Sequence, residues 1–327
     1  MKESQIPGGG HVDVPGFPSS LDDVILVTHA GCLDGSACAL VFITFGGRMK
    51  NVRFVAAGMA ERFIKDDPVM SSSSFVIFAD VGLNSPKYAD VLEKRGNVVF
   101  LDHHSTSNHM HDRPWAEIDV MNTRCGALML LDFLKSKTAA AASTDPQSFS
   151  WKLDHVRKLV VSVDDFDRWV RNDPVGDDLS LLHVFYGQRS FIKLMTENPI
   201  PHVMYDSSQL IETLRQRRDE GIGDAVKRAF VHTLTDPETG RSYQAAVAVS
   251  SDPNISQLLA RLLSEFPACD LAVQVNLDRR QSSFRSRDGG PNVAAICASL
   301  GGGGHVHASG HRLQGSIHKE IARLIYG

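Results

Sequence analysis

The sequence contains no apolar run near the roughly 20 residues that a membrane-spanning helix needs. Its first 20 residues also lack the apolar core of a secretory signal peptide, and we expect residues 1–20 to form a flexible or loosely packed lead-in. These absences predict a protein that has no membrane as a partner.

Paired cysteines are missing as well. The chain has five cysteines and no CxxC pair: Cys32, Cys38, Cys125, Cys269 and Cys297. An odd, scattered set argues against a disulfide framework and against a zinc site made of thiolates. We therefore expect a reducing compartment and a cytoplasmic location.

The sequence also lacks an excess of positive charge. Lysine and arginine total 34 against 38 aspartates and glutamates, and the formal net charge is -4. Long nucleic acids are held largely through many phosphate contacts to Lys and Arg, so long duplex nucleic acid is excluded as the main partner. A smaller anionic partner must be bound locally.

Apolar residues, in contrast, are plentiful. They make up 43% of the 327 residues, which is enough to bury a large core, and a chain of this length predicts two domains. Short aliphatic runs alternate with amphipathic stretches: VILVTH, DGSACALVFITFG, NVRFVAAG, SFVIFAD, SPKYADVLEKRG, NVVFLDHH and RCGALMLLDFLKS. This alternation predicts an α/β domain with a doubly wound parallel sheet.

Changes in the pattern of apolar and polar residues along the chain predict the domain boundaries. We expect an α/β catalytic domain over residues 21–190, connecting helices over 191–235, and a smaller α/β domain over 236–327 that ends in a helix after GGGGHVHASGH. Oligomeric state is not predicted by these patterns, and a homodimer is left open.

Three of the predicted strands end in polar residues, as VTH, FAD and FLDHH. Open α/β sheets place their ligand sites at the carboxyl ends of the strands, so these side chains should meet in one crevice. They are His29, Asp80, Asp102, His103 and His104. Taken singly, such an aspartate is more often a helix cap or a turn residue. Their coincidence, together with Asp34, favours a site for hard or borderline divalent ions such as Mn²⁺.

The order of five motifs is more specific. THAGCLDGSA, FADVG, LDHHST, VDDFDRW and GGGGHVHASGH follow one another from about Val24 onward. This series resembles the DHH phosphoesterase family with its DHH-associated C-terminal domain. Because it shows no further nucleic-acid modules, the chain resembles the nanoRNases within that family.

The resemblance implies a centre of two Mn²⁺ ions, with Mg²⁺ or another divalent ion as the alternative. It implies that His29 binds the first metal, Asp34 the second, and Asp80 bridges both. His103 and one aspartate of VDDFD complete the second metal's ligands, and we favour Asp165 over Asp164 because it starts a D-x-D-x-W step.

Other residues are expected to support the site or to bind substrate. Asp102 is expected to anchor the centre, and His104 to donate a proton or bind phosphate. We expect the glycine motif to bind substrate, because its backbone N–H groups can approach a phosphate. The residues expected to do so are Gly302, Gly303, Gly304 and His305. Arg285, with Arg287 as the alternate, stands where the family has an arginine that grips a terminal phosphate.

The chain departs from the family pattern at Cys32, which stands where the first aspartate of an aspartate pair is usual. A thiolate at this position would favour softer ions such as Zn²⁺, and a neutral thiol would leave the first metal short of a ligand. The ordinary alternative is that Cys32 packs beneath the loop as a small hydrophobic residue.

These expectations predict a metal-dependent phosphodiesterase that cleaves linear dinucleotides, such as pGpG or pApA, and very short oligonucleotides to mononucleotides. Two alternatives within the enzyme class are a phosphatase acting on 3′-phosphoadenosine phosphate and a cyclic-dinucleotide phosphodiesterase. An alternative of another class, given Cys32, is a catalytically silent nucleotide-binding regulator.

Overall fold

The computed structural model describes residues 12, 14–56, 58–138, 146–236 and 239–313. The chain forms two compact units. The first comprises the described residues of Met1–His103 and Ser107–Gly176, and the second those of His104–Thr106 and Asp177–Gly327. In the described residues, no helix has both the length and the apolar character that crossing a membrane requires.

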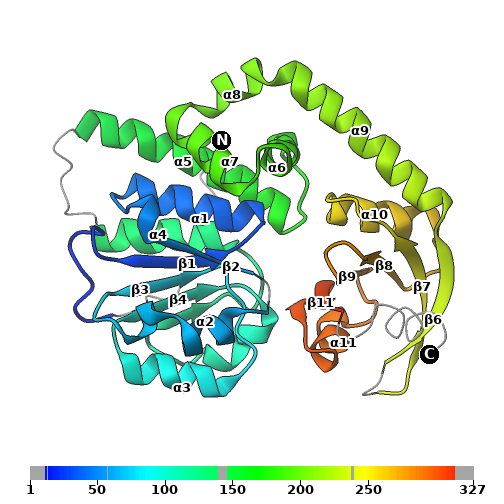
Figure 1. The fold of residues 1–327 in the computed structure, drawn as a ribbon, viewed down its shortest axis with the longest axis horizontal. Helices are drawn as coiled ribbons and strands as arrows, with labels where there is room; N and C mark the ends of the chain where they lie inside the picture. The colour runs from blue at the N-terminus through cyan, green and yellow to red at the C-terminus, as the bar shows by residue number, and fades with distance from the viewer. Residues whose placement is uncertain (1–11, 13, 57, 139–145, 237–238, 314–327) are drawn as a thin grey trace. The chain divides into compact units, whose positions relative to one another are not determined.

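Five parallel strands form the sheet of the first unit in the order β2-β1-β3-β4-β5 (Figure 1). Their bounds are β1 Ile25–His29, β2 Val52–Val55, β3 Val76–Ala79, β4 Val98–Asp102 and β5 Ala116–Ile118. The predicted α/β fold with a parallel sheet is confirmed. The short strand β5 was not among the expected strands, since its sequence AEI has too few apolar residues to stand out.

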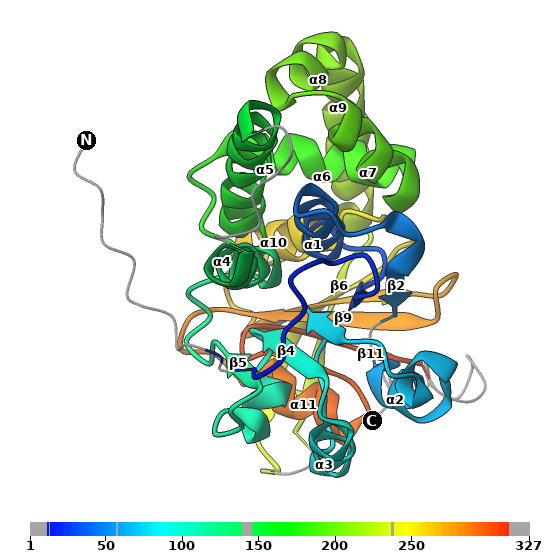
Figure 2. The same ribbon diagram turned by 90° about the vertical axis from the view of Figure 1, so that its left-hand side faces the viewer.

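Helices cover both faces of this sheet (Figures 1 and 2). α1 (Leu33–Thr44) and α4 (Gly126–Thr138) lie on one face, and α2 (Ala60–Asp66) and α3 (Pro86–Arg95) lie on the other. α5 (Pro146–Asp167) packs against α1 and α4. Three short 3₁₀ helices complete the unit: η1 Met49–Asn51, η2 Pro68–Ser71 and η3 Ser105–Met110, which begins in the segment His104–Thr106.

The central strands are buried because helices cover both of their faces. Every residue of β3 and β4 is buried, including Asp102 at the end of β4. Alternate residues, such as Phe78 and Phe100, pack in the core beneath α2 and α3. Burial on both faces explains why these strands appear in the sequence as continuous aliphatic runs.

The second unit contains a mixed sheet in the order β10-β11-β9-β8-β7-β6, in which only β7 and β8 pair in parallel. Its strands are β6 Phe230–Thr235, β7 Ser242–Val249, β8 Leu271–Asn276, β9 Gln281–Ser286, β10 Gly303–His305 and β11 Ala308–Arg312. The helices after α5 are α6 Pro174–Tyr186, α7 Gln188–Glu197, α8 Ile200–Asp206, α9 Ser208–Lys227, α10 Ile255–Glu265 and α11 Val293–Ser299. Separate apolar clusters join α10 and α11 to the sheet.

Two expectations concern the ends of the chain. The expected final helix falls on residues 314–327, which lie outside the described residues. Within the described part of the expected lead-in, the ring of Phe17 packs edge to face against Phe75 and Phe133, with centroids 5.1 Å apart in each case, whereas Ser19 and Ser20 are exposed.

The strand order decides where a ligand can bind. In a sheet ordered 2-1-3-4-5, the chain reverses its winding direction between β1 and β3, and open α/β sheets bind their ligands beyond the carboxyl ends of the two strands at this point. β1 ends at His29, and Asp80 directly follows β3. The polar strand ends of the sequence therefore meet at the switch point of the sheet.

Candidate metal centre

Two overlapping groups of side chains bring the predicted metal ligands together. Ligand atoms of His29, Cys32 and Asp80 lie within 4.8 Å of one another, and so do those of Asp34, Asp80 and His103. Asp80 belongs to both groups. The first unit therefore presents two neighbouring ligand sets that share one carboxylate, as a pair of bridged divalent ions requires.

Asp80 is held in an unusual backbone conformation. Its φ angle is 58°, in the left-handed region that non-glycine residues avoid. Its neighbour Gly126, at the start of α4, must lack a side chain, because a Cβ there would lie 2.5 Å from the Cβ of Asp80. A strained residue that its surroundings fix in place is typical of functional sites.

Two contacts place Asp34 deep in the site. Asp34 is 1% exposed, and its two carboxylate oxygens accept backbone N–H groups of Gly126 (2.8 Å) and Ala127 (2.9 Å) in the first turn of α4. Burial, and then the charges of Asp80 and Asp167, raise the pKa of Asp34 well above its ordinary range. This crowding of buried carboxylates fits a site that binds a divalent cation, because a cation would offset the repulsion among them.

The ring of His103 is oriented through both of its nitrogens. Nδ1 lies 2.9 Å from Oδ1 of Asn122, and Nε2 lies 3.5 Å from Asp80, 3.7 Å from Asp167 and 3.8 Å from Asp34. Burial would lower the pKa of His103, but the hydrogen bond to Asp80 and the charges of Asp167 and Asp34 raise it well above its ordinary value. Because an amide oxygen only accepts, Nδ1 carries the proton in that contact, and Nε2 faces the carboxylates.

Asp102 is linked to residues near the site through a chain of hydrogen bonds. It is fully buried and accepts a 2.5 Å hydrogen bond from the hydroxyl of Ser107, which in turn accepts one from the backbone N–H of Leu83. Asp102 thereby joins the end of β4 to the loop that follows Asp80. This position agrees with an anchoring function.

Cys32 lies in the site and does not pack beneath the loop. Its thiol donates to Oδ2 of Asp80 at 3.2 Å, and its sulfur accepts the backbone N–H of Gly35 at 3.1 Å, which caps α1. Burial, followed by the charges of Asp80 and Asp34, raises the pKa of Cys32 well above its ordinary value. The thiol thus points at the carboxylate that the two ligand groups share.

The structure favours another aspartate of VDDFD over the expected Asp165, whose function as a ligand stays a prediction. Both carboxylate oxygens of Asp165 accept backbone N–H groups of the following loop, from Asn172 (3.1 Å) and Asp173 (3.0 Å). The alternate, Asp164, accepts the N–H of Cys125 and pairs with Arg168. Asp167 is the aspartate of this segment that lies next to His103.

Helical periodicity does not single out Asp167. Val156, Val160 and Val163 form a buried stripe of α5 that leads to Asp167, but buried Leu159 and Ser162 lead in the same way to Asp165. The contribution of Asn122 had no sequence signal either. It lies in a loop, with a φ of 51°, and only the folded chain brings it to His103.

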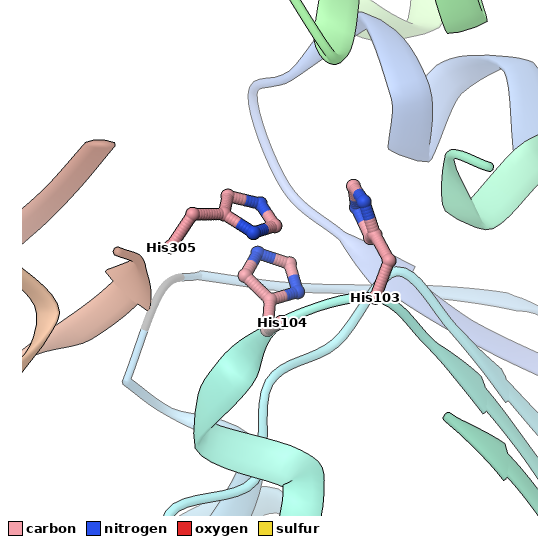
Figure 3. A group of neighbouring side chains, drawn as sticks. All are labelled: His103, His104 and His305. Atoms are coloured by element: carbon pink, nitrogen blue, oxygen red, sulfur yellow. The ribbon is translucent and has the colours of Figure 1, made fainter. Parts of the chain in front are cut away.

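His104 belongs with the second unit. Its ring stacks on that of His305, with centroids 4.8 Å apart and planes 16° from parallel, as Figure 3 shows. The hydroxyl of Ser105 donates to the carbonyl oxygen of Gly304 at 2.7 Å. The LDHHST motif therefore supplies a histidine of the candidate ligand cluster and, one residue later, a neighbour of the glycine motif.

The glycine motif forms a tight hairpin. β10 and β11 pair with Gly303 opposite Gly310, and a Cβ on Gly302 would lie 2.2 Å from the carbonyl oxygen of Gly310. At Gly304, where φ is 141°, a Cβ would lie 2.6 Å from the carbonyl oxygen of Ala308. These glycines are needed for strand pairing, and phosphate binding by the motif stays a prediction.

The structure distinguishes the two candidate arginines. Arg287 donates to the carbonyl oxygens of Leu263, Phe266 and Cys269, so its guanidinium is used at the end of α10. Arg285 lies on β9 between two alanines, Ala272 of β8 and Ala308 of β11. The sequence-based preference for Arg285 as a substrate ligand stays a prediction, and Arg287 has a structural function.

Comparisons with known proteins agree with these features. No family model matches the chain. Oligoribonuclease NrnB from Bacillus subtilis is 21% identical over 308 residues, which cover 88% of this chain and 72% of the relative. The solved DHH domain of a protein described as a member of a family of ribosomal proteins superposes with a TM-score of 0.51 at 12% identity, covering 92% of this chain and 85% of the other.

A further solved structure, the pGpG-specific phosphodiesterase PggH from Vibrio cholerae, gives a TM-score of 0.46 at 14% identity, covering 92% of this chain and 97% of the other. The fold is that of the DHH domain. This fold and the sequence similarity to oligoribonuclease NrnB together confirm the resemblance to the DHH phosphoesterases that the five motifs indicated.

Proposed function

We propose that this protein is a metal-dependent phosphodiesterase that hydrolyses linear dinucleotides and very short oligonucleotides to mononucleotides. The observation that carries the proposal is the pair of ligand groups sharing Asp80 at the ends of β1, β3 and β4. The similarity to an oligoribonuclease supports the choice of substrate class. The net charge of -4 agrees with a short substrate, because no excess of positive charge is available for a long one.

The donor atoms suit two divalent ions of hard or borderline character, and we propose Mn²⁺. His29, Cys32 and Asp80 would hold the first, and Asp34, Asp80, His103 and Asp167 the second. When bound, such ions supply a nucleophilic water at neutral pH and neutralise charge on the phosphate. Asn122 orients the ring of His103 through a hydrogen bond, and Gly126 leaves room for Asp80 because it has no side chain.

Residues of the second unit are proposed to bind the substrate. Arg285, a partly exposed residue, suits a terminal phosphate, because the planar donors of its guanidinium match phosphate oxygens in pairs. His104 and His305, stacked as one pair, are proposed to contact phosphate, with His104 as a proton donor. Arg285→Ala and His305→Ala should therefore raise KM and leave the metal content unchanged.

The test is hydrolysis of labelled pGpG with and without Mn²⁺, extended to cyclic dinucleotides and 3′-phosphoadenosine phosphate. We expect mononucleotides from the linear dinucleotide only with metal. Asp80→Asn and Asp167→Asn should each fall below about a tenth of the wild-type rate, because each removes a charged oxygen ligand.

The matched control is Asp154→Asn, which changes an exposed aspartate of the same helix α5 and should be neutral. If Asp80→Asn kept more than about a tenth of the rate, the two-metal assignment would be wrong. Nucleotide binding without any hydrolysis would instead identify a regulator.

A further inference from the structure

Among the described residues of the first unit, four other than glycine adopt a positive φ: Asp80 (58°), Asn122 (51°), Trp169 (64°) and Arg171 (63°). Each such residue costs on the order of 1–2 kcal/mol, so the surrounding structure must fix it. Asp80 belongs to the proposed metal ligands, and Asn122 orients His103. Trp169 and Arg171 follow Asp167 by two and four residues, and nothing in the arrangement of metal ligands accounts for their strain.

The loop that contains Trp169 and Arg171 is fixed from both sides. The carboxylate of Asp165 accepts the N–H groups of Asn172 and Asp173, and its carbonyl oxygen accepts the N–H of Val170 at 2.9 Å. The carboxylate of Asp173 accepts the hydroxyl of Ser162 on α5 at 2.5 Å. These hydrogen bonds tie the loop to α5 next to Asp167.

Within this loop the guanidinium of Arg171 lies against two aromatic rings. Its central carbon is 3.6 Å from the centre of the Trp169 ring and 4.2 Å from that of Phe166. Its Nε and Nη2 atoms are buried, whereas Trp169 stays partly exposed. A desolvated cation over an aromatic face contributes about 2 kcal/mol, so Arg171 holds the indole in place and covers part of it.

From this geometry we infer that Trp169 stacks on a nucleobase of the substrate and that Arg171 is a positioning residue for its ring. The inference rests on the proposed function, since it adds base recognition to the same site. Two residues span at most about 7 Å, so the indole stands within nucleotide reach of Asp167. A ring that is already fixed loses little conformational entropy on binding, and a stacked base contributes about 1–3 kcal/mol.

The first experiment measures binding to the full chain with Mn²⁺ by calorimetry, using guanosine 5′-monophosphate and ribose 5-phosphate, which lacks the base. Wild type should bind the nucleotide more tightly than the sugar phosphate. Trp169→Leu should weaken nucleotide binding by about 5- to 150-fold, the equivalent of one stacked base, and leave ribose 5-phosphate unchanged. Trp169→Phe keeps a flat ring and should stay within about threefold of wild type.

Trp151→Leu is the matched control, because Trp151 is 52% exposed on α5 and should not affect either ligand. Arg171→Gln should raise KM for pGpG with kcat retained, and Arg171→Lys, which keeps the cation, should restore most of the loss. The inference would be overturned if wild type and Trp169→Leu bound the nucleotide equally tightly. It would also be overturned if Trp169→Leu weakened the binding of both ligands to the same extent. Because binding is measured without turnover, base recognition through Trp169 in a protein that hydrolyses nothing would refute the proposed function alone.

Discussion

The proposed cluster of metal ligands depends on two glycines as well as on the ligands themselves. Gly126 leaves room for Asp80, and Gly35 does the same for β1, because a Cβ on Gly35 would lie 2.1 Å from the carbonyl oxygen of His29. Neither glycine has positive φ. These two positions are therefore required for space, because a side chain at either would collide with a residue of the proposed ligand set.

Gly126→Ala should inactivate the enzyme. The added Cβ would meet the Cβ of Asp80 at 2.5 Å and must displace this carboxylate from the site. The measurement is the rate of pGpG hydrolysis with Mn²⁺, together with the urea midpoint. The control is Gly223→Ala in α9, where a Cβ meets nothing within 4 Å and should stabilise by about 0.5–1 kcal/mol. Full activity of Gly126→Ala would show that Asp80 is not held as described.

Cys32 should tune the choice of metal. Its sulfur lies 3.2 Å from Oδ2 of Asp80, so a carboxylate at this position would add a hard ligand. Cys32→Asp should lower the Mn²⁺ concentration for half-maximal activity, and Cys32→Ala should raise it. Cys32→Ser separates capping from ligation, because serine caps α1 and lacks the soft sulfur. Metal dependence equal to wild type in both Cys32→Asp and Cys32→Ala would exclude Cys32 from the metal ligands.

At the scale of elements, the end of α5 contributes to two proposed sites. Asp167 lies 3.7 Å from His103, and the neighbouring Asp165 fixes the loop of Trp169 and Arg171. The motif VDDFDRW is thus divided by helical geometry between a proposed metal ligand, a loop anchor and a proposed stacking residue. Letter spacing alone could not divide it, because the two aspartates of D-x-D differ only in the direction each takes from the helix axis.

α6 carries a buried histidine that should make stability depend on pH. His183 is 6% exposed, its ring lies edge to face on Phe191, and burial lowers its pKa from 6.5 to about 4. The unfolded chain therefore binds a proton that the folded chain does not between pH 6.5 and 4. Stability should fall as pH falls through this window, by up to about 3 kcal/mol from this group.

The measurement is the difference in urea midpoint between pH 7 and pH 5 in metal-free buffer. His183→Gln cannot titrate, so it should lose less stability on acidification than wild type. The comparison isolates His183, because every other titrating group is shared by the two proteins. An equal loss in both would show that His183 is protonated in the folded state.

At the scale of the whole molecule, charge limits the substrate. With a net charge of -4 the chain offers no broad positive field along which a long strand could be held. The hydrolysis rate per end should fall steeply as single-stranded oligomers lengthen from two to about ten nucleotides. The check is a series of end-labelled oligomers at fixed salt. Equal rates along the series would indicate a processive exonuclease instead.

The sequence by itself determined the class of fold and most of the proposed ligands. Continuous aliphatic runs that end in His29, Asp80 and Asp102–His103 are local signals, because a parallel strand buried on both faces must be apolar until it reaches the edge of the sheet. Cys32 could be singled out by its place in the motif. Its contact with Asp80 could not, since it depends on how α1 starts against β3.

Only the tertiary structure decided which aspartate of α5 faces the site, that Asn122 orients His103, and that Arg287 is used at the end of α10. It also brought Arg171 against Trp169 in a strained loop. These contacts join residues through the direction of side chains and through positive φ angles, and neither leaves a periodic pattern in the sequence. Periodicity records which residues are buried, whereas the partner that a buried polar group meets is decided by packing.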